Sequence, residues 1–266
     1  MPANKTNSLH YGEKVSIDFY PDSHRYRNTK TGEWLISNTA CVGILDKSRP
    51  FLIKSQKLSG DYFRKYLDDS GRKSFKGEEM ISLMEKSLRQ WDDYCNEGKE
   101  IGTKFHDWAE KFAQAKIAGT AEPEIDESLG VKLVQAISGF LSWYNSNEIK
   151  FLEPEKVIYS KKNDFVGITD AIVILNGKKT ILDYKTSKSG HYPEYKFQIA
   201  GYAGAYIEEY GELDNAFILN FSKETGDFEA IEISMEEMKK NYDIFLALLK
   251  VKRRLKELDI YANGNL

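Results

Sequence analysis

The chain has 266 residues, of which 41% are hydrophobic, 13% aromatic and 30% charged, and its formal net charge is −3. This composition is typical of a folded chain with a sizeable core, and no apolar stretch approaches the roughly 18–20 residues of a membrane-spanning helix. The first ten residues lack the apolar centre of a secretory signal peptide, so we expect a cytoplasmic protein. The two cysteines, Cys41 and Cys95, form no CxxC motif, which argues against a disulfide framework, a zinc finger and an iron–sulfur cluster.

The first 150 residues mix short strands with helices. We expect a flexible polar leader over residues 1–14, then strands and turns over residues 15–45, and short helical segments around a charged loop over residues 46–95. Apolar side chains recur at helical period between residues 97 and 117, which predicts a helix there; they are Ile101, Phe105, Trp108, Phe112 and Ile117. A second amphipathic helix is predicted over residues 128–147.

From residue 151 the pattern changes to apolar runs bounded by turn residues, which predicts strands. The runs are EKVIYS, GITDAIVIL, KTILDYKTS, NAFILNF and DFEAIEI, with one helix inserted over residues 192–211 and a last helix over residues 235–258. We therefore expect an α/β fold with a mixed central sheet flanked by helices and a largely helical N-terminal half. No linker rich in Pro or Ser divides the chain, so residues 15–266 are expected to form one domain, with parts at 15–150 and 151–266.

Three charged side chains interrupt two of these apolar runs: Asp170, Asp183 and Lys185. The Asn176–Gly177 pair between the runs is a strong signal for a two-residue hairpin turn, which would place Asp170 opposite Asp183. A four-residue loop would place Asp170 opposite Lys185 instead. Side chains alternate along a strand, so all three would share a face in either register, whereas a three-residue loop would separate them.

Two opposed carboxylates explain why charge is kept in such an apolar place. Side chains across a strand pair lie ~5 Å apart, and two carboxylates at that distance repel one another. A divalent cation removes this repulsion, and carboxylate oxygens suit Mg²⁺ or Mn²⁺ together with a substrate phosphate. Lys185 would orient water or offset charge on the phosphate. The pattern thus favours metal-dependent phosphodiester hydrolysis over the plainer alternative, an Asp–Lys ion pair on a half-exposed strand.

These residues resemble the RecB-type branch of the PD-(D/E)XK nuclease superfamily, over roughly residues 97–203. GITD is similar to the motif of the first metal ligand, Asp170, and DYK to the motif of a second ligand, Asp183, and the catalytic lysine, Lys185. PEKVIYS places an acid, Glu155, where related exonucleases carry one near the metal. The proline of the family name is absent, because Thr169 precedes Asp170.

Two helical motifs extend the resemblance. QIAGY is similar to a Q-x-x-x-Y motif, which implies that Gln198 and Tyr202 belong to the catalytic site, with Gln198 bonded to a phosphate or a ligand. GTKFHDWAE is similar to the upstream helix that supplies a histidine ligand, here His106, followed by Glu110. Taken singly, each of these residues is more often an ordinary core or surface residue.

Lysines near the motifs are candidates for nucleic-acid binding through phosphates, which confers affinity without sequence specificity. They are Lys161, Lys162, Lys188 and Lys196. Rings near predicted loops are candidates for base stacking, namely Tyr26, Trp34, Phe51 and Tyr192. The basic stretch over residues 250–256 on the last helix is a further candidate or a solvated face.

The resemblance implies a DNA exonuclease that uses one or two Mg²⁺ or Mn²⁺ ions on DNA with free ends, in recombination, repair or phage DNA processing. The segment HRYRNTKTGEWLISNTACVGIL is similar to the front of phage-type and mitochondrial-maintenance-type exonucleases, some of which form homo-oligomers. A recombination partner protein is a further expectation. Two alternatives stay open: an endonuclease of the same superfamily, or a catalytically silent nucleic-acid-binding module. The chain has no P-loop motif, so we expect no nucleotide cofactor.

Overall fold

The computed structural model describes residues 5–72, 74–125, 130–188 and 190–258. The chain divides into two compact units, which we name the sheet unit (residues 1–44 and 104–266) and the hairpin unit (residues 45–103). The expectation of one domain over residues 15–266 stays a prediction.

The sheet unit is built on an open mixed sheet. In the described residues it has nine strands: β1 (Thr6–His10), β2 (Val15–Tyr20), β3 (Arg25–Asn28), β4 (Trp34–Ser37), β5 (Ile149–Ser160), β6 (Phe165–Leu175), β7 (Lys178–Lys185), β8 (Asn215–Phe221) and β9 (Phe228–Ile233). Their order is β1-β2-β3-β4-β6-β7-β8-β9, and β5 pairs with β6. The pairs β4–β6 and β7–β8 are parallel and the others antiparallel. The predicted mixed α/β architecture is confirmed in this coarse form.

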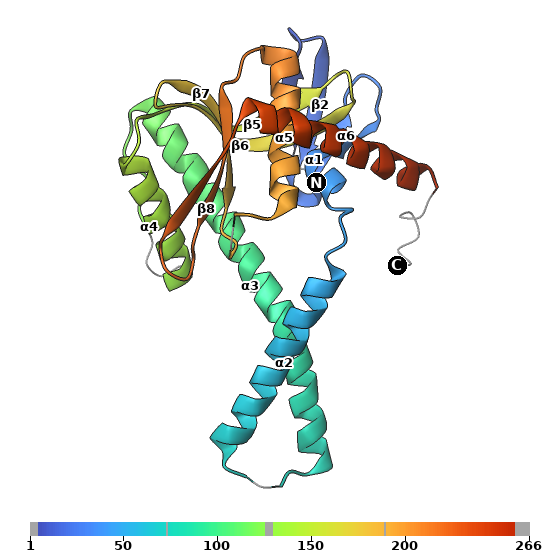
Figure 1. Ribbon diagram of the computed structural model, residues 1–266, viewed down its shortest axis with the longest axis vertical. Coiled ribbons are helices and arrows are strands. Elements are labelled where there is room, and N and C mark those ends of the chain that lie inside the picture. The colour runs from blue at the N-terminus through green and yellow to red at the C-terminus, as the bar shows by residue number, and fades with distance from the viewer. Residues whose placement is uncertain (1–4, 73, 126–129, 189, 259–266) are drawn as a thin grey trace. The chain divides into compact units, whose positions relative to one another are not determined.

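Helices cover both faces of the sheet (Figure 1). Helices α1 (Asn38–Val42), α5 (Pro193–Tyr210) and α6 (Met235–Glu257) form one apolar core with the sheet. Helix α4 (Val131–Asn145) and residues 104–118 of α3 (Gly77–Ala118) form a second core with it. A short 3-10 helix, η1 (Pro21–Ser23), joins β2 to β3.

The start of the chain differs from the prediction of a flexible leader over residues 1–14. Residues 6–10 form strand β1, antiparallel to β2. The TNSLH sequence has no apolar alternation because its main partners are polar: His10 is buried, with its Nδ1 2.8 Å from Glu209 Oε2 on α5. A second correction concerns residues 38–42, which form α1 rather than a strand or turn, with the Ser37 hydroxyl accepting from the amide of Ala40 as an N-cap.

The hairpin unit consists of two long helices rather than the predicted short segments. Helix α2 (Ser48–Ser70) runs antiparallel to the first part of α3 (Figure 1). Ser59 donates to Ser87 across the pair, and Phe51 packs against Trp91. No described residue of α2 is buried, so the apolar periodicity that would predict a long helix is weak there. The helix predicted over residues 97–117 is the last part of α3.

The turn at Asn176–Gly177 is the two-residue form. Leu175 pairs with Lys178, and the ladder between β6 and β7 continues to Ala171 and Leu182. Both turn residues have positive φ, 50° for Asn176 and 80° for Gly177, as a type I′ hairpin turn requires. The alternative register, with Asp170 opposite Lys185, is therefore wrong.

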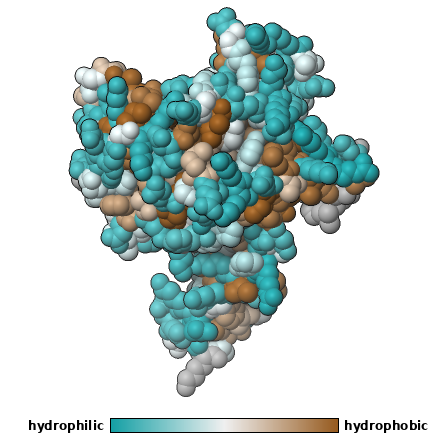
Figure 2. Space-filling model, turned by 45° about the horizontal axis from the view of Figure 1, so that its top comes forward, coloured by the Kyte–Doolittle hydropathy of each residue, from teal (hydrophilic) through white to brown (hydrophobic). Residues whose placement is uncertain are grey.

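The surface is mainly hydrophilic in the view of Figure 2, where hydrophobic residues form separate patches. Among the described helices, none has the length and apolar character needed to span a membrane. Of the four rings considered for base stacking, Tyr26 is only 2% exposed and packs in the core beneath β2 and β3, so it is excluded as a stacking surface. Trp34, Phe51 and Tyr192 are 37%, 49% and 41% exposed.

The contact between α5 and α6 yields a first testable prediction. A Cβ added at Gly204 would overlap the ring of Tyr242 on α6. We expect Gly204→Ala to lower the free energy of unfolding by about 1–3 kcal/mol, because overpacking outweighs the gain in helix propensity. Gly60→Ala, in the exposed middle of α2 with open space around the added Cβ, is the matched control and should raise it by about 0.5–1 kcal/mol. Urea unfolding measures both, and an equal gain in both variants would contradict the packing argument.

Candidate active site

The candidate site lies beside residues 167–170 of β6, between the part of that strand that pairs with β4 and the part that pairs with β7. Along one edge of β6, β4 pairs with residues 165–166 and β7 with residues 171–175, while β5 follows the other edge. Residues 167–170 of β6 therefore have no ladder partner on the first edge. Side chains take over there: the Thr169 hydroxyl donates to the carbonyl of Leu182, and the Asp170 carboxylate accepts from the amide of Tyr184. Asp170 is thus fixed at an opening in the sheet.

Asp170 also contacts helix α3. Its Oδ1 lies 2.9 Å from His106 Nδ1, and the side chains are 16% and 31% exposed. Burial lowers the pKa of His106, but the Asp170 carboxylate outweighs this and raises the pKa above its usual value. Burial in turn raises the pKa of Asp170, and the His106, Lys185 and Tyr184 groups together hold that pKa below its usual value. Both shifts favour the charged forms of the two side chains.

Asp183 and Lys185 form a second ion pair on β7. Lys185 Nζ lies 2.6 Å from Asp183 Oδ2, and the two side chains are 15% and 4% exposed. Burial, and secondly the charge of Asp170, raise the pKa of Asp183 to about 6 despite the lysine. Burial lowers the pKa of Lys185, but Asp183 and Asp170 outweigh it, so the pKa of Lys185 lies above its usual value. Lys185 is therefore a cation at neutral pH.

Helix α5 supplies the third side of the site. Lys185 Nζ donates to Gln198 Oε1 at 3.2 Å, and Gln198 Nε2 donates to the Tyr202 hydroxyl at 2.8 Å. Lys185 also lies 4.8 Å from the ring centroid of Tyr195. Gln198 and Tyr202 are buried, so a chain of contacts through α5 fixes the position of the lysine.

Further carboxylates face Asp170 from β5 and α3. Pro154 pairs with Ala171 and Lys156 with Thr169, which places Glu155 across from Asp170. Partial burial, followed by the charges of Glu110 and Asp170, raises the pKa of Glu155 to about 7. Burial, followed by Asp107, also raises the pKa of Glu110. Glu155 has a φ of 42°, in the left-handed region that is rare for a non-glycine residue.

The side chains fit a hard divalent cation in their chemistry, since carboxylate oxygens and one imidazole converge here. Asp183 Oδ2 already has the Lys185 ammonium as its partner at 2.6 Å, so the chemistry of the donor set alone supports this fit. The geometry is that of closed ion pairs, and among the described residues no three His, Cys, Asp or Glu side chains come together as a ready metal site. A cation bound here would take the place of the Asp170–His106 and Asp183–Lys185 ion pairs.

Of the four lysines predicted to bind nucleic acid, Lys188 follows Lys185 by three residues and Lys196 precedes Gln198 by two. Lys161 and Lys162 lie in the β5–β6 turn, where the Lys162 amide donates to Glu208. Glu208 lies ten residues beyond Gln198 on α5, or about 15 Å along the helix. Lys196 pairs with Glu237 of α6 at 2.7 Å, and Lys188 is exposed in the segment after β7.

Three residues that shape the candidate site were not predicted from the sequence. Tyr195 lies three residues before Gln198 on α5, so helical spacing alone would have placed it beside the lysine. Thr169 holds the opening in the sheet, as described above. Asn38 of α1 donates to the carbonyl of Gln198 at 3.1 Å; this contact joins residues 160 apart, and no local pattern signals it.

No family model matches the sequence, and no curated protein matches it at a significant level. The solved structures that match include an alkaline exonuclease from Laribacter hongkongensis, LHK-Exo, which is 14% identical. The match covers 59% of this chain and 85% of that chain, with a TM-score of 0.29, or 0.30 for its complex with dAMP. Another is the protein SSO0001, 17% identical, with a TM-score of 0.29 over 46% of this chain and 60% of that chain.

Proposed function

We propose that this chain is a Mg²⁺- or Mn²⁺-dependent deoxyribonuclease that hydrolyses phosphodiester bonds at DNA ends. One observation carries the proposal: Asp170, Asp183 and Lys185 meet in a buried cluster at an opening of the sheet, with His106 and Gln198 in direct contact with it. Two buried carboxylates and a buried lysine are costly to keep in a folded chain. A site that must bind a cation and a phosphate accounts for all of them.

Each side chain has a role that follows from its contacts. Asp170 and Asp183 would hold the cation, with His106 and Glu155 as further ligands for one ion or two. When bound, the ion supplies charge neutralisation at the phosphate and a water of lowered pKa. Lys185, released from Asp183, would place its ammonium at the phosphate and stabilise the charge that develops there. Its raised pKa favours this electrostatic role over that of a base.

Gln198 and Tyr202 act through Lys185. Gln198 Oε1 holds the ammonium, and Tyr202 fixes the amide of Gln198. With Tyr195 beside it, the lysine would stay in place when Asp183 turns to the cation. Processing of ends in recombination, repair or phage replication is the role that the proposal suggests for the whole chain.

The proposal is tested by offering the chain linear and covalently closed circular DNA, each in Mg²⁺ and in Mn²⁺, with Asp183→Ala as the blank. We expect loss of the linear DNA alone, because an exonuclease needs a free end, and end labels then give the polarity. Cutting of the circle would instead make the chain an endonuclease. If neither DNA is lost with either metal, the proposed hydrolysis is wrong and a silent binding module becomes the better account.

A further inference from the structure

A second surface that suits a ligand lies on the outer face of strands β1–β4. The strand registers place Asn7 opposite Asp18, Asp18 opposite Arg27, and Arg27 opposite Trp34, so these four side chains form a row across the sheet. Tyr20 and Arg25 form the next pair. The opposite face of these strands carries Ile17 and Tyr26, whose side chains are buried in the core. We call the six residues of the first face the outer face; they are Asn7, Asp18, Tyr20, Arg25, Arg27 and Trp34.

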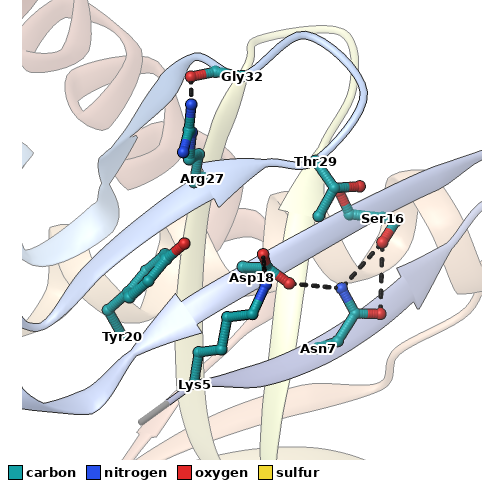
Figure 3. Close-up of a pocket in the computed structure, with 8 residues that line it drawn as sticks. All are labelled: Lys5, Asn7, Ser16, Asp18, Tyr20, Arg27, Thr29 and Gly32. Atoms are coloured by element: carbon teal, nitrogen blue, oxygen red, sulfur yellow. Dashed lines mark hydrogen bonds and ion pairs between the residues drawn. The ribbon is translucent and has the colours of Figure 1, made fainter. Parts of the chain in front are cut away.

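The outer face is hollowed. A cavity of about 590 Å³ lies over it, and Lys5, Asn7, Asp18, Tyr20 and Arg27 are among the side chains around it in Figure 3. This volume is within the range of small-molecule sites. The residues of the candidate active site do not line it, so the hollow is a separate feature of the sheet unit.

Aromatic rings and guanidinium groups lie together on the outer face. The guanidinium carbon of Arg25 lies 4.0 Å from the ring centroid of Trp34, and that of Arg27 lies 5.7 Å from it. The rings of Tyr20 and Trp34 are 5.3 Å apart at an angle of 55°. Trp34 keeps 37% of its surface exposed. The indole of Trp34 is thus held by Arg25 and Tyr20 while part of it stays open to solvent.

The charge of this surface is positive. Its one acid, Asp18, is paired with Lys5 at 2.6 Å and accepts from Asn7, while Asp22 lies in η1 and Glu33 in the connection before β4. In the described part of the chain, neither Arg25 nor Arg27 has an ion-pair partner. Lys256, in the basic stretch of α6, donates to the carbonyl of Trp34 at 3.4 Å and so adds a cation beside the ring.

We propose that the outer face binds single-stranded DNA at a second site, apart from the site of hydrolysis. Arg25, Arg27 and Lys256 would contact phosphates, and unpaired bases would stack on Trp34 and Tyr20. Stacking needs a free base face, which a duplex does not offer, so the combination of rings and cations favours a single strand over a duplex or an acidic protein. The proposal rests on the proposed function only in taking DNA as the polymer.

Binding of fluorescein-labelled (dT)20 in EDTA, followed by anisotropy, tests the role of the ring. We expect Trp34→Ala to raise Kd by about 5-fold or more, as loss of one stacked base does, and Trp34→Tyr to keep most of the affinity. Double replacement Arg25→Gln and Arg27→Gln should lower the slope of log Kd against log salt by about 1.4, since each phosphate contact on a single strand contributes ~0.7. The matched control is the double replacement Lys150→Gln and Lys178→Gln. Both lysines are exposed and lie near the β6–β7 turn.

A crosslinking measurement keeps the test decisive if a variant unfolds. Wild-type protein irradiated with an oligonucleotide that carries 5-iodo-deoxyuridine should give adducts on the peptides of Trp34 or Tyr20. Unchanged Kd in all outer-face variants, or crosslinks elsewhere only, would overturn the proposal. So would equal binding of poly-glutamate with no effect of Trp34→Ala, because it would show an acidic-protein surface.

Hydrolysis of bis(4-nitrophenyl) phosphate separates this proposal from the proposed function. This small diester cannot span two sites, so outer-face variants should hydrolyse it like the wild type. If no diester or DNA is cleaved while Trp34→Ala still weakens (dT)20 binding, the proposed function fails and the second site stands. If cleavage is normal and the outer-face variants bind (dT)20 like the wild type, the reverse holds.

Discussion

Replacing Lys185 with methionine is expected to lower the rate of DNA cleavage by roughly 10²–10³-fold or more, the usual cost of removing one group that stabilises charge in a transition state. The reason is the position of its ammonium between Asp183 and Gln198, where a phosphate beside the carboxylates would meet it. DNA binding should change by a few-fold at most, because the phosphate backbone is contacted at several points. Gel-based cleavage rates and anisotropy in Ca²⁺ measure the two quantities.

Lys178→Met is the matched control for this variant. Lys178 lies at the other end of β7 and is exposed, so its loss removes the same charge without reaching the site. Removing Lys185 also leaves Asp183 buried and unpaired, which destabilises the fold by ~3 kcal/mol or more unless the carboxyl is protonated. Circular dichroism at the assay temperature therefore accompanies the rates. Normal cleavage by a folded Lys185→Met variant would remove the lysine from the mechanism.

Replacing Asp170 with asparagine is expected to abolish both Mn²⁺ binding and cleavage. The Asn oxygen can still accept from the Tyr184 amide, so the opening in the sheet is kept, but the negative charge that a cation needs is lost. Calorimetric titration with Mn²⁺ measures binding without reference to activity. We expect the midpoint of thermal unfolding to move by a few degrees at most.

The control is Asp164→Asn, in the turn before β6. Asp164 accepts from the hydroxyl of Tyr159 at 2.8 Å and has no contact with the site. Its replacement should leave Mn²⁺ affinity as it is. Retention of full Mn²⁺ affinity by Asp170→Asn would show that the ion binds elsewhere in the chain, and the assignment of the β6 opening as the metal site would be withdrawn.

Most of the sheet was predictable because its strands carry strong local signals. Strand β8 has the predicted bounds, and the two-residue form is the one observed among the loop lengths left open at Asn176–Gly177. The errors fall where tertiary contacts replace local pattern. Strand β1 is polar because His10 binds Glu209 almost 200 residues away, and α2 buries too little to show a clear apolar period.

The grouping of the candidate residues was predictable, but their geometry was not. Periodicity placed Asp170, Asp183 and Lys185 together, but the ladder ends at Ala171 and Leu182, one pair before the two carboxylates meet. The reason is that β4 pairs with part of the same edge of β6. Local residue spacing does not show which strands are neighbours in the sheet. Asn38 was missed because its contact with Gln198 joins residues 160 apart, whereas the helical spacing of Tyr195 and Gln198 could have placed Tyr195 beside the lysine.

The contacts of His10 and Tyr11 with α5 affect the order in which the chain folds during synthesis. Tyr11 donates to Glu208 and His10 contacts Glu209, which closes loops of 197 and 199 residues. Such distant closures form late, since their entropy is lost before any contact compensates for it. During synthesis the two helices of the hairpin unit can pair as soon as they emerge. Strand β1 can form its contacts with α5 only after residues 193–210 have been synthesised. A nascent chain halted before residue 193 therefore lacks both Gln198 and the anchor of its own first strand, and would have no assembled centre with which to attack nucleic acid.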